Sequence, residues 1–165
     1  ARPVRRGRGS GGATLVAVLH EVRDPGNAGT VLRAADAAGA DAVIFSGESI
    51  DPWHPKVVRS TTGSLFHVPV ALAPTLHEAV DALRAAGLQV WAADVHGTEL
   101  SPRDPMLAAP TGWVFGNEAR GLTEADRALA DSARRLPMYG SAESLNLATA
   151  ASVCLYTTAF AQRSE

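Results

Sequence analysis

Short apolar runs rich in β-branched residues alternate with alanine-rich segments along this chain of 165 residues. Strands buried on both faces have nearly continuous apolar sequences, whereas half-exposed strands alternate apolar and polar residues. The runs therefore predict an α/β fold with a mainly parallel six-stranded sheet, covered by helices on both faces. The predicted strands are Thr14–His20, Asp41–Ser46, Phe66–Leu72, Leu88–Asp94, Gly112–Gly116 and Ala133–Met138.

Helical signals separate these strands. The segment Asn27–Ala40 has Asn27 as a candidate N-cap and Gly39 as a stop, and Thr75–Gly87 is amphipathic and ends on a glycine. We expect the last helix to lie within Gly140–Phe160, which has an apolar second half. The shorter predicted helices are Lys56–Thr62 and a segment over 123–130 that Thr123 caps.

The composition is that of a globular protein with one domain and a real core, because 46% of the residues are hydrophobic and 19% are charged. The single cysteine, Cys154, excludes an internal disulfide and a cysteine-based zinc cluster, and its apolar surroundings predict a small buried side chain. The sequence has neither a signal-peptide pattern nor an apolar run of about 20 residues. We therefore expect a cytoplasmic protein that contacts no membrane.

Charge is unevenly distributed along the chain. The first residues, RPVRRGRGSGG, carry four arginines and no acidic side chain, while the rest of the chain has 11 basic and 17 acidic residues. We interpret residues 1–12 as a flexible arm or linker that precedes one domain over residues 13–165. A tail that contacts RNA and a linker between domains are both open interpretations of this arm. Phosphate contacts supply most of the affinity for nucleic acid, so an acidic body that binds RNA must concentrate its basic groups locally or borrow them from another domain.

Polar, glycine-containing segments follow four of the predicted strands. Since ligands of open parallel sheets gather at the carboxyl ends of the strands, we expect these segments to meet at one rim. They are Glu21–Arg33, Asp94–Leu100, Gly116–Leu122 and Met138–Asn146.

Several familiar sites are excluded or unsupported. Gly116 and Gly121 have the outer spacing of a phosphate loop, but Leu122 and Thr123 stand where that loop needs Lys and Ser or Thr. No dinucleotide-binding glycine pattern follows the first strand, no nucleophile-elbow motif is present, and the five histidines lack metal-ligand spacing. We expect chemistry without a metal.

Two features remain to be explained. Arg33 lies among apolar residues in a helix with little other charge, where a guanidinium needs an anion or a dipole as partner. The last helix begins with a polar cluster that contains Ser144 and Asn146, and we interpret Ser144 as its N-cap and this polar first turn as one wall of an active site.

These residues carry a family resemblance. The segments NAGTVLRAADAAGADAVIF, WVFGNEARGL and LPMYGSAESLNLATAASVCLY resemble the three ordered motifs of the SpoU-type, or TrmH-like, RNA ribose 2′-O-methyltransferases of the SPOUT superfamily. The intervening DPWHPKVVRSTTGSLFHVPV is also similar to that family, and the likeness extends over about residues 14–160. The three motifs together, in order, are a specific signal.

The resemblance implies S-adenosylmethionine as cofactor, a deep C-terminal trefoil knot and a homodimer. It also implies that residues 13–165 are the catalytic domain and that the N-terminal RNA-binding domain usual in the family is not in this chain. General fold rules argue against a knot. By position in the motifs, the implied cofactor-binding residues are Gly116, Leu136, Met138, Leu145 and Asn146, and the implied catalytic residues are Arg33, Asn27, Glu118, Ser144 and Asn146. We expect Arg33 to orient phosphate or stabilise a developing alkoxide, since a guanidinium is normally protonated; proton abstraction by Arg33 is the alternative.

The sequence therefore predicts methylation of a ribose 2′-hydroxyl in structured RNA, with 23S ribosomal RNA as the leading substrate and transfer RNA as the second. A paralogue that binds cofactor or RNA without turnover is an alternative, as is an unrelated α/β enzyme acting on a small molecule. The target nucleotide stays open.

Overall fold

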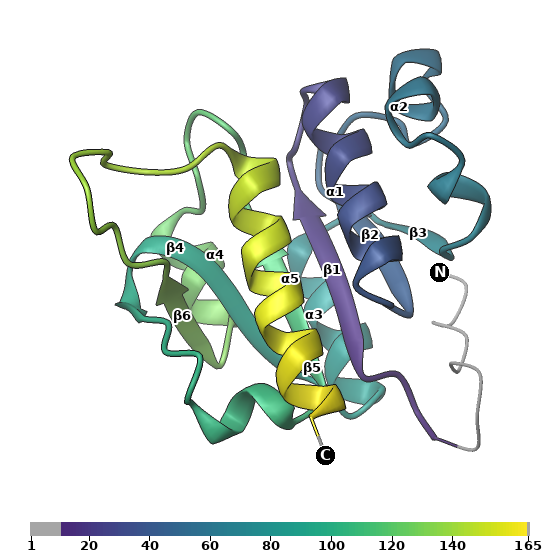
Figure 1. Ribbon diagram of the computed structural model, residues 1–165. Helices are drawn as coiled ribbons and strands as arrows, with labels where there is room; N and C mark the ends of the chain where they lie inside the picture. The colour runs from purple at the N-terminus through teal and green to yellow at the C-terminus, as the bar shows by residue number, and fades with distance from the viewer. Residues whose placement is uncertain (1–10, 165) are drawn as a thin grey trace.

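Six strands form one parallel sheet in the order β3-β2-β1-β5-β4-β6, as the computed structural model, which describes residues 11–164, shows (Figure 1). The chain builds outward from the centre on one side, through β1, β2 and β3, and then crosses to the other. β5 lies between β1 and β4, so the strand order reverses between β1 and β5. The strands are β1 (Leu15–His20), β2 (Ala42–Ser46), β3 (Val70–Ala73), β4 (Gln89–Glu99), β5 (Thr111–Phe115) and β6 (Ser132–Arg135).

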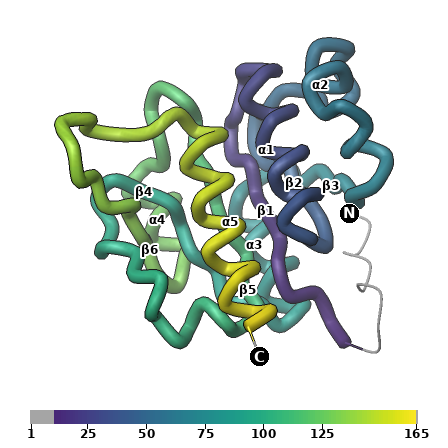
Figure 2. The backbone as a smooth tube through the Cα atoms, in the orientation of Figure 1, coloured from purple at the N-terminus to yellow at the C-terminus, as the bar shows by residue number. Residues whose placement is uncertain are grey.

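Helices cover both faces of the sheet, as the sequence predicts. The longest helices, α1 and α5, lie on one face, and α3 lies on the other (Figures 1 and 2). Each face has its own apolar core. Leu32 and Leu155 are buried in the core under α1 and α5, and Val80 and Leu83 are buried in the core under α3. The helices are α1 (Pro25–Ala37), α2 (Pro55–Ser60), α3 (Leu76–Ala85), α4 (Glu124–Leu129) and α5 (Leu147–Arg163), with 3-10 turns η1 (Ser64–Phe66) and η2 (Pro105–Ala108).

Trp113 in the middle of β5 fixes α5 on the sheet. Its indole is fully buried and its Nε1 donates a hydrogen bond of 2.8 Å to the hydroxyl of Thr158 on α5. Trp91 of β4 meets it edge to face at 5.6 Å between ring centroids. A buried indole N–H needs a partner, and Thr158 supplies it, so the register of α5 against β5 is specified.

The third, fourth and sixth strands differ from their predicted bounds. β4 runs to Glu99, five residues past the predicted end at Asp94. Phe66, predicted to begin the third strand, is the last residue of η1, which follows Gly63 with its φ of 98°. Pro69, which has no N–H to give to a ladder, precedes β3, and the strand begins at Val70. The sixth strand ends at Arg135 rather than Met138, because Leu136 to Met138 turn away to line a cavity.

The start of α1 was also predicted wrongly. Its N-cap is Asp24, whose carboxylate accepts a hydrogen bond of 2.7 Å from the Asn27 backbone, and Pro25 occupies the first helical position. Asn27 lies within the first turn. Asp before Pro is a stronger start signal than Asn27, because Pro is tolerated where the helix has no N–H bond to lose.

The last helix begins later than predicted. α5 starts at Leu147, and Asn146 caps it by accepting hydrogen bonds of 2.9 and 3.4 Å from the backbones of Ala148 and Thr149. The prediction of Ser144 as N-cap is therefore wrong. Residues 141–145, which include the polar Ser141, Glu143 and Ser144, form an exposed segment that precedes the helix.

Two predictions about the overall organisation stay predictions. Most of the arm at 1–12 falls outside the described residues, so the division into arm and catalytic domain is one of them. The trefoil knot, an implication of the family resemblance, is the other. Within residues 11–164, no helix combines the length and the apolar character that crossing a bilayer requires.

Candidate active site at the carboxyl edge of the sheet

A cavity of about 790 Å³ opens at the carboxyl edge of β4, β5 and β6. Three of the four polar segments predicted to meet at this rim contribute to its walls, namely residues 94–99, 116–122 and 136–145. The fourth, after β1, borders the second of these segments through hydrogen bonds. The predicted convergence is therefore confirmed, and it lies next to the point where the strand order reverses, where open α/β sheets bind ligands.

Four of the five predicted cofactor-binding residues line this cavity: Gly116, Leu136, Met138 and Leu145. Gly116 has no room for a side chain, because a Cβ there would lie 2.6 Å from the carbonyl carbon of Gly121. The segment between these glycines folds back on itself, and the Gly121 N–H donates to the Asn117 carbonyl at 2.8 Å. Asn146, the fifth predicted residue, does not line the cavity.

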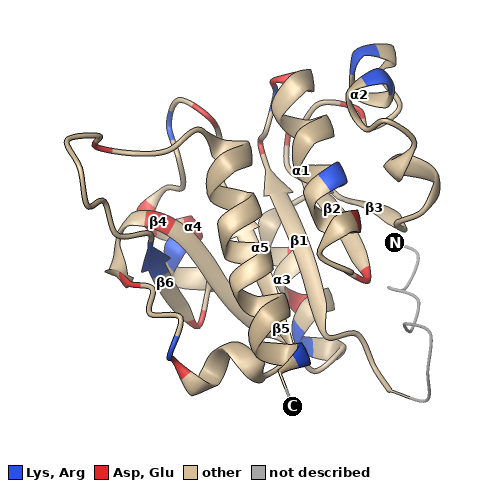
Figure 3. Cartoon of the chain, viewed as in Figure 1, with Lys and Arg blue, Asp and Glu red and all other residues tan. Residues whose placement is uncertain are grey.

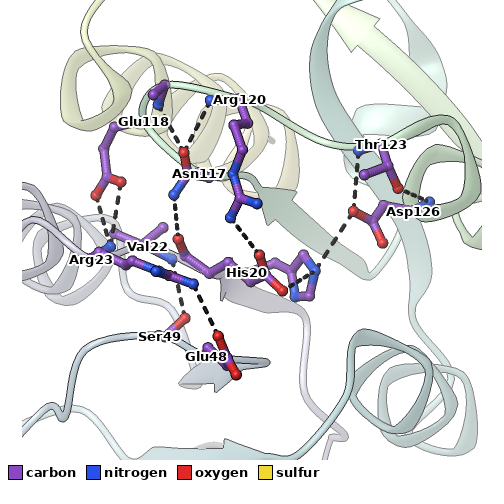
Figure 4. Close-up of polar contacts among 12 residues, drawn as sticks. His20, Val22, Arg23, Glu48, Ser49, Asn117, Glu118, Arg120, Thr123 and Asp126 are labelled. Carbon is purple, nitrogen blue, oxygen red and sulfur yellow. Dashed lines mark hydrogen bonds and ion pairs between the residues drawn. The ribbon is translucent and has the colours of Figure 1, made fainter.

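Glu118 joins the cavity wall to the start of α1. Its carboxylate accepts hydrogen bonds from the backbone N–H groups of Arg23, at 3.1 and 3.3 Å, and of Asp24, at 2.9 Å (Figure 4). A carboxylate is stabilised beside a helix N-terminus, where N–H groups have no partner within the helix. Glu118 thus fastens the loop after β5 to the segment that begins α1.

Asn117 is a residue that the sequence analysis missed. Its amide nitrogen donates to the Glu21 carbonyl at 2.9 Å, and its amide oxygen accepts from the backbones of Ala119 and Arg120, both at 3.0 Å. Arg120 returns to Glu21 through an ion pair of 2.8 Å (Figure 4). Asn117 shapes the loop and fastens it to the end of β1. An Asn directly after an apolar strand was the available signal, since such residues often bond backbone groups one or two positions on.

His20, the last residue of β1, contacts the neighbouring elements β2 and α4. Its Nδ1 lies 2.9 Å from the Ser46 hydroxyl, and its Nε2 lies 3.6 Å from the carboxylate of Asp126, which belongs to the capping box of α4 (Figure 4). The side chain is buried. These interactions tie β1 to β2 and α4, so we assign His20 a structural role.

The two asparagines predicted for the site meet in space although 119 residues separate them. The Asn146 amide nitrogen donates to the Asn27 side-chain oxygen at 3.2 Å. This bond brings the first turn of α1 to the cap of α5, beside the cavity wall. Sequence reasoning placed both residues in one site but gave no reason for them to touch.

The remaining predicted residues, Ser144 and Arg33, differ in their relation to the cavity. Ser144 is exposed and lines the cavity. Arg33 is exposed on α1, within two turns of Asn27, and does not line the cavity. It forms no ion pair with the residues that the structure describes.

A comparison with protein families identifies the family of this chain. A model of the SpoU rRNA methylase family matches residues 14–156, which include every residue of the candidate site. The chain belongs to the SpoU rRNA methylase family.

Two curated proteins similar to this SpoU-family chain are named as 23S ribosomal RNA methyltransferases. The 23S rRNA (uridine(2479)-2′-O)-methyltransferase of Streptomyces viridochromogenes is 44% identical over 137 residues, 80% of this chain and 47% of that protein. The 23S rRNA (guanosine(2553)-2′-O)-methyltransferase RlmP of Bacillus subtilis is 40% identical over 148 residues, 87% of this chain and 57% of that protein. The chain thus spans about half the length of these relatives.

Solved structures agree with the family. The SpoU methyltransferase AviRb from Streptomyces viridochromogenes in complex with AdoMet superimposes with a TM-score of 0.81 at 39% identity, over 90% of this chain and 57% of that one. A structure that concerns 2-OH methylation of C/U34 on tRNA gives a TM-score of 0.78 at 31% identity, over 91% of this chain and 96% of that one.

The chemistry available in this SpoU-family site is limited by its residues. Cys154 lies at the cavity floor, and burial raises the pKa of its thiol to about 12, so it stays a neutral apolar group and not a nucleophile. Its burial confirms the sequence prediction. Within residues 11–164, no group of three or more His, Cys, Asp or Glu side chains is placed to hold a metal ion.

Proposed function

We propose that this chain is the catalytic portion of an S-adenosylmethionine-dependent RNA ribose 2′-O-methyltransferase, with ribosomal RNA as substrate. The observation that carries the proposal is the junction of a cavity of about 790 Å³ with the Asn27–Asn146 hydrogen bond at the carboxyl edge of the sheet. The ribosomal RNA methyltransferases among its relatives support the choice of substrate. An RNA substrate of this kind places the enzyme in the cytoplasm.

The cavity fits the cofactor in size and charge. Its volume lies within the range of about 300–1,000 Å³ usual for pockets that enclose small molecules. Leu136 and Leu145 offer apolar surface for an adenine ring, and Gly116 lets the backbone approach closely. Each arginine that lines the cavity has a carboxylate partner, Arg120 with Glu21, Arg134 with Asp104 and Arg135 with Glu99. These ion pairs reduce the repulsion that a cationic sulfonium would otherwise meet.

When bound, S-adenosylmethionine supplies a methyl group that a sulfonium already activates. The residues of this chain then have to position the ribose and stabilise its oxygen, because a 2′-hydroxyl is a poor nucleophile. Ser144, which lines the cavity, and Asn27, on the side of α1, can hydrogen-bond the ribose from two directions. Arg33 lies outside the cavity, so we assign it to the RNA, where its charge holds a phosphate or the developing alkoxide.

Glu118 has a different role in this proposal. Its carboxylate is engaged with the backbone at the start of α1. It therefore positions α1, with Asn27 and Arg33, relative to the cavity wall. We class it as a positioning residue rather than a general base.

The direct test is transfer of a labelled methyl group from S-adenosylmethionine to purified 23S ribosomal RNA. Mapping alkali-resistant linkages in the product then identifies the ribose, since a 2′-O-methyl group blocks cleavage. We expect one resistant position in ribosomal RNA and none in the transfer RNA control. Cofactor binding with no transfer to any RNA would favour the paralogue without turnover.

Transfer RNA is the second candidate substrate. The structure that concerns methylation of tRNA matches 91% of this chain, and this chain covers 96% of that one. A tRNA-modifying protein can therefore have about the length of this chain. A resistant position in transfer RNA instead of ribosomal RNA would select this alternative.

We also propose a homodimer, on the basis of an apolar stripe on α5. Val153, Tyr156 and Phe160 are 41%, 37% and 69% exposed and share one helix face. A second cavity of about 340 Å³ lies beside them, between α5 and the end of α1. Light scattering should give twice the chain mass of 17.1 kDa, and Phe160→Asp should reduce it to the monomer mass. A monomer mass for the unmodified chain at high concentration would contradict the dimer.

A further inference from the structure

Unpaired cations are concentrated in one region of the structure. Six of the eleven basic side chains in residues 11–164 form an ion pair with a carboxylate. Since these pairs neutralise most of the positive charge elsewhere, the unpaired side chains mark where an anion meets least competition. Within the same range, the five basic residues without such a pair are Arg33, Lys56, Arg59, Arg103 and Arg163.

Three of these five lie on two helices that pack together. Arg33 is on α1, while Lys56 and Arg59 are on α2, three residues apart and so on neighbouring positions of its surface (Figure 3). The helices meet at Gly29, where an added Cβ would lie 2.1 Å from the Cβ of Ser60. Arg33 follows Gly29 by one helical turn, which places it along the same side of α1.

The carboxylates that border this region have other partners, since Asp51 accepts from the Trp53 backbone and Asp36 of α1 lies 3.4 Å from His67 Nδ1. Residues 52–77 contain no Asp or Glu, although the chain as a whole is acidic. Lys56 and Arg59 are exposed, and α2 lies beside the N-terminal half of α1, near the carboxyl edge of the sheet that carries the candidate active site (Figure 1). The region thus has the local basic concentration that an acidic RNA-binding protein requires.

An exposed aromatic ring accompanies these cations. Trp53, two residues before α2, is 57% exposed, whereas the other two tryptophans of the chain, Trp91 and Trp113, are 2% and 0% exposed. Its backbone N–H is fixed by a hydrogen bond of 2.9 Å to the Asp51 carboxylate. A large exposed indole beside unpaired cations matches the way single-stranded nucleic acid is bound, with bases stacked on aromatic rings and phosphates on basic groups.

We infer that Trp53, Lys56 and Arg59 form a docking surface for single-stranded RNA that flanks the methylated nucleotide, here named the α2 surface. The inference rests on the proposed function and deepens it, because it assigns the part of the chain that holds the substrate. Arg33 lies on α1, which packs against α2 at Gly29 and Ser60. The cation proposed to hold the RNA and the α2 surface therefore belong to one pair of packed helices.

Tryptophan fluorescence tests the α2 surface directly. Trp91 and Trp113 are shielded, so quenching by acrylamide reports mainly on Trp53. A twelve-nucleotide oligouridylate should quench this emission by stacking and protect it from acrylamide, and Trp53→Phe should abolish both effects. Unchanged emission and unchanged acrylamide quenching at saturating oligonucleotide would overturn the inference.

Charge removal provides the second test. In Lys56→Ala/Arg59→Ala, the KM for ribosomal RNA should rise about tenfold with kcat changed less than twofold, while cofactor affinity is kept. The slope of log affinity against log salt should fall by about 0.7 for each phosphate that the variant no longer neutralises. The matched control is Arg103→Ala, which removes another exposed cation without an ion pair, just before η2. The η2 turn is bonded to Gln89 at the amino end of β4. Equal KM values for the double variant and this control would refute the α2 surface.

The two proposals fail in different ways. If the unmodified chain transfers no methyl group to any RNA, the proposed function fails, and the fluorescence titration still decides whether the α2 surface binds RNA. If transfer occurs but the double variant matches Arg103→Ala, only the α2 surface fails. Binding of an acidic protein with no response to oligouridylate would equally refute an RNA surface.

Discussion

The two halves of the sheet differ in the features that could bind a ligand. The half with β4, β5 and β6 encloses a cavity of about 790 Å³, and the arginines that line it are all paired with carboxylates. The half with β1, β2 and β3 forms no part of that cavity, but its helices α1 and α2 carry three exposed cations without a carboxylate partner among residues 11–164. The β4–β6 half therefore provides a cavity, and the β1–β3 half provides exposed positive charge.

This difference matches the two ligands of the proposed reaction. A small cofactor needs an enclosed site with most of its surface covered, whereas an RNA strand needs exposed positive charge. The halves meet where Glu118 bonds the start of α1 and where Asn146 bonds Asn27. Methyl transfer would then take place at the boundary, and the following variants test whether the halves act separately.

The largest expected effect is that of Arg33→Ala. Removing a guanidinium that stabilises charge on the ribose oxygen or phosphate should lower methyl transfer by about 100-fold or more. Cofactor affinity should stay within twofold, because Arg33 does not line the cavity. The two readouts are labelled transfer to RNA and calorimetric titration with cofactor. Normal transfer by this variant would remove Arg33 from the mechanism.

Gly116→Ala should act on the opposite half. The new methyl group would lie 2.6 Å from the Gly121 backbone, so the loop must shift and the cavity wall with it. We expect cofactor affinity to fall about 10-fold or more, measured by calorimetry. Gly140→Ala is the control, because a Cβ at that position meets nothing within 4 Å. Equal cofactor affinity in the two variants would show that the Gly116 loop does not form the cofactor site.

Glu118→Gln addresses the boundary between the halves. The amide oxygen can still accept from the backbones of Arg23 and Asp24, but the side chain loses the charge that favours the helix N-terminus, so unfolding free energy should fall by about 1 kcal/mol. Glu48→Gln removes an exposed carboxylate that pairs with Arg23 on the same side and should change stability by less than about 0.5 kcal/mol. Urea denaturation measures both. A change in transfer with no change in stability would assign Glu118 to the chemistry instead of positioning.

The last variant concerns the cavity floor, at Cys154, and its effect appears only at alkaline pH. The thiol pKa is raised from 9.0 to about 12, so between these values the unfolded chain loses a proton that the native chain keeps. Unfolding free energy should therefore fall by about 1.4 kcal/mol for each pH unit above 9. Cys154→Ala lacks this contribution, and its stability should depend less steeply on pH. Identical slopes in urea denaturation at pH 8 to 10.5 would contradict burial of the thiol.

Several site features follow from local sequence signals. Near-continuous apolar strands require a sheet that is covered on both faces, and polar segments after such strands must gather at one edge. The family resemblance assigned Gly116, Leu136, Met138 and Leu145 to one cofactor site, and all four line the cavity. The start of α1 was also readable, since Asp24 before Pro25 is a strong start signal, and the choice of Asn27 overlooked it.

Other features depend on partners far along the chain. Nothing near Ser144 indicates that α5 starts after Asn146 rather than before it, because the cap is decided by which side chain also reaches Asn27, 119 residues away. The role of Asn117 likewise depends on the Glu21 carbonyl at the end of a different strand.

The sequence by itself determined the α/β class, the parallel sheet, the family motifs and the edge at which they gather, because periodicity and local turn chemistry are properties of neighbouring residues. Only the tertiary structure decided that the cavity and the unpaired cations lie on different halves. Pairing and enclosure depend on which side chains from distant segments come within a few ångströms of one another, and the packing of the helices on the sheet sets those distances.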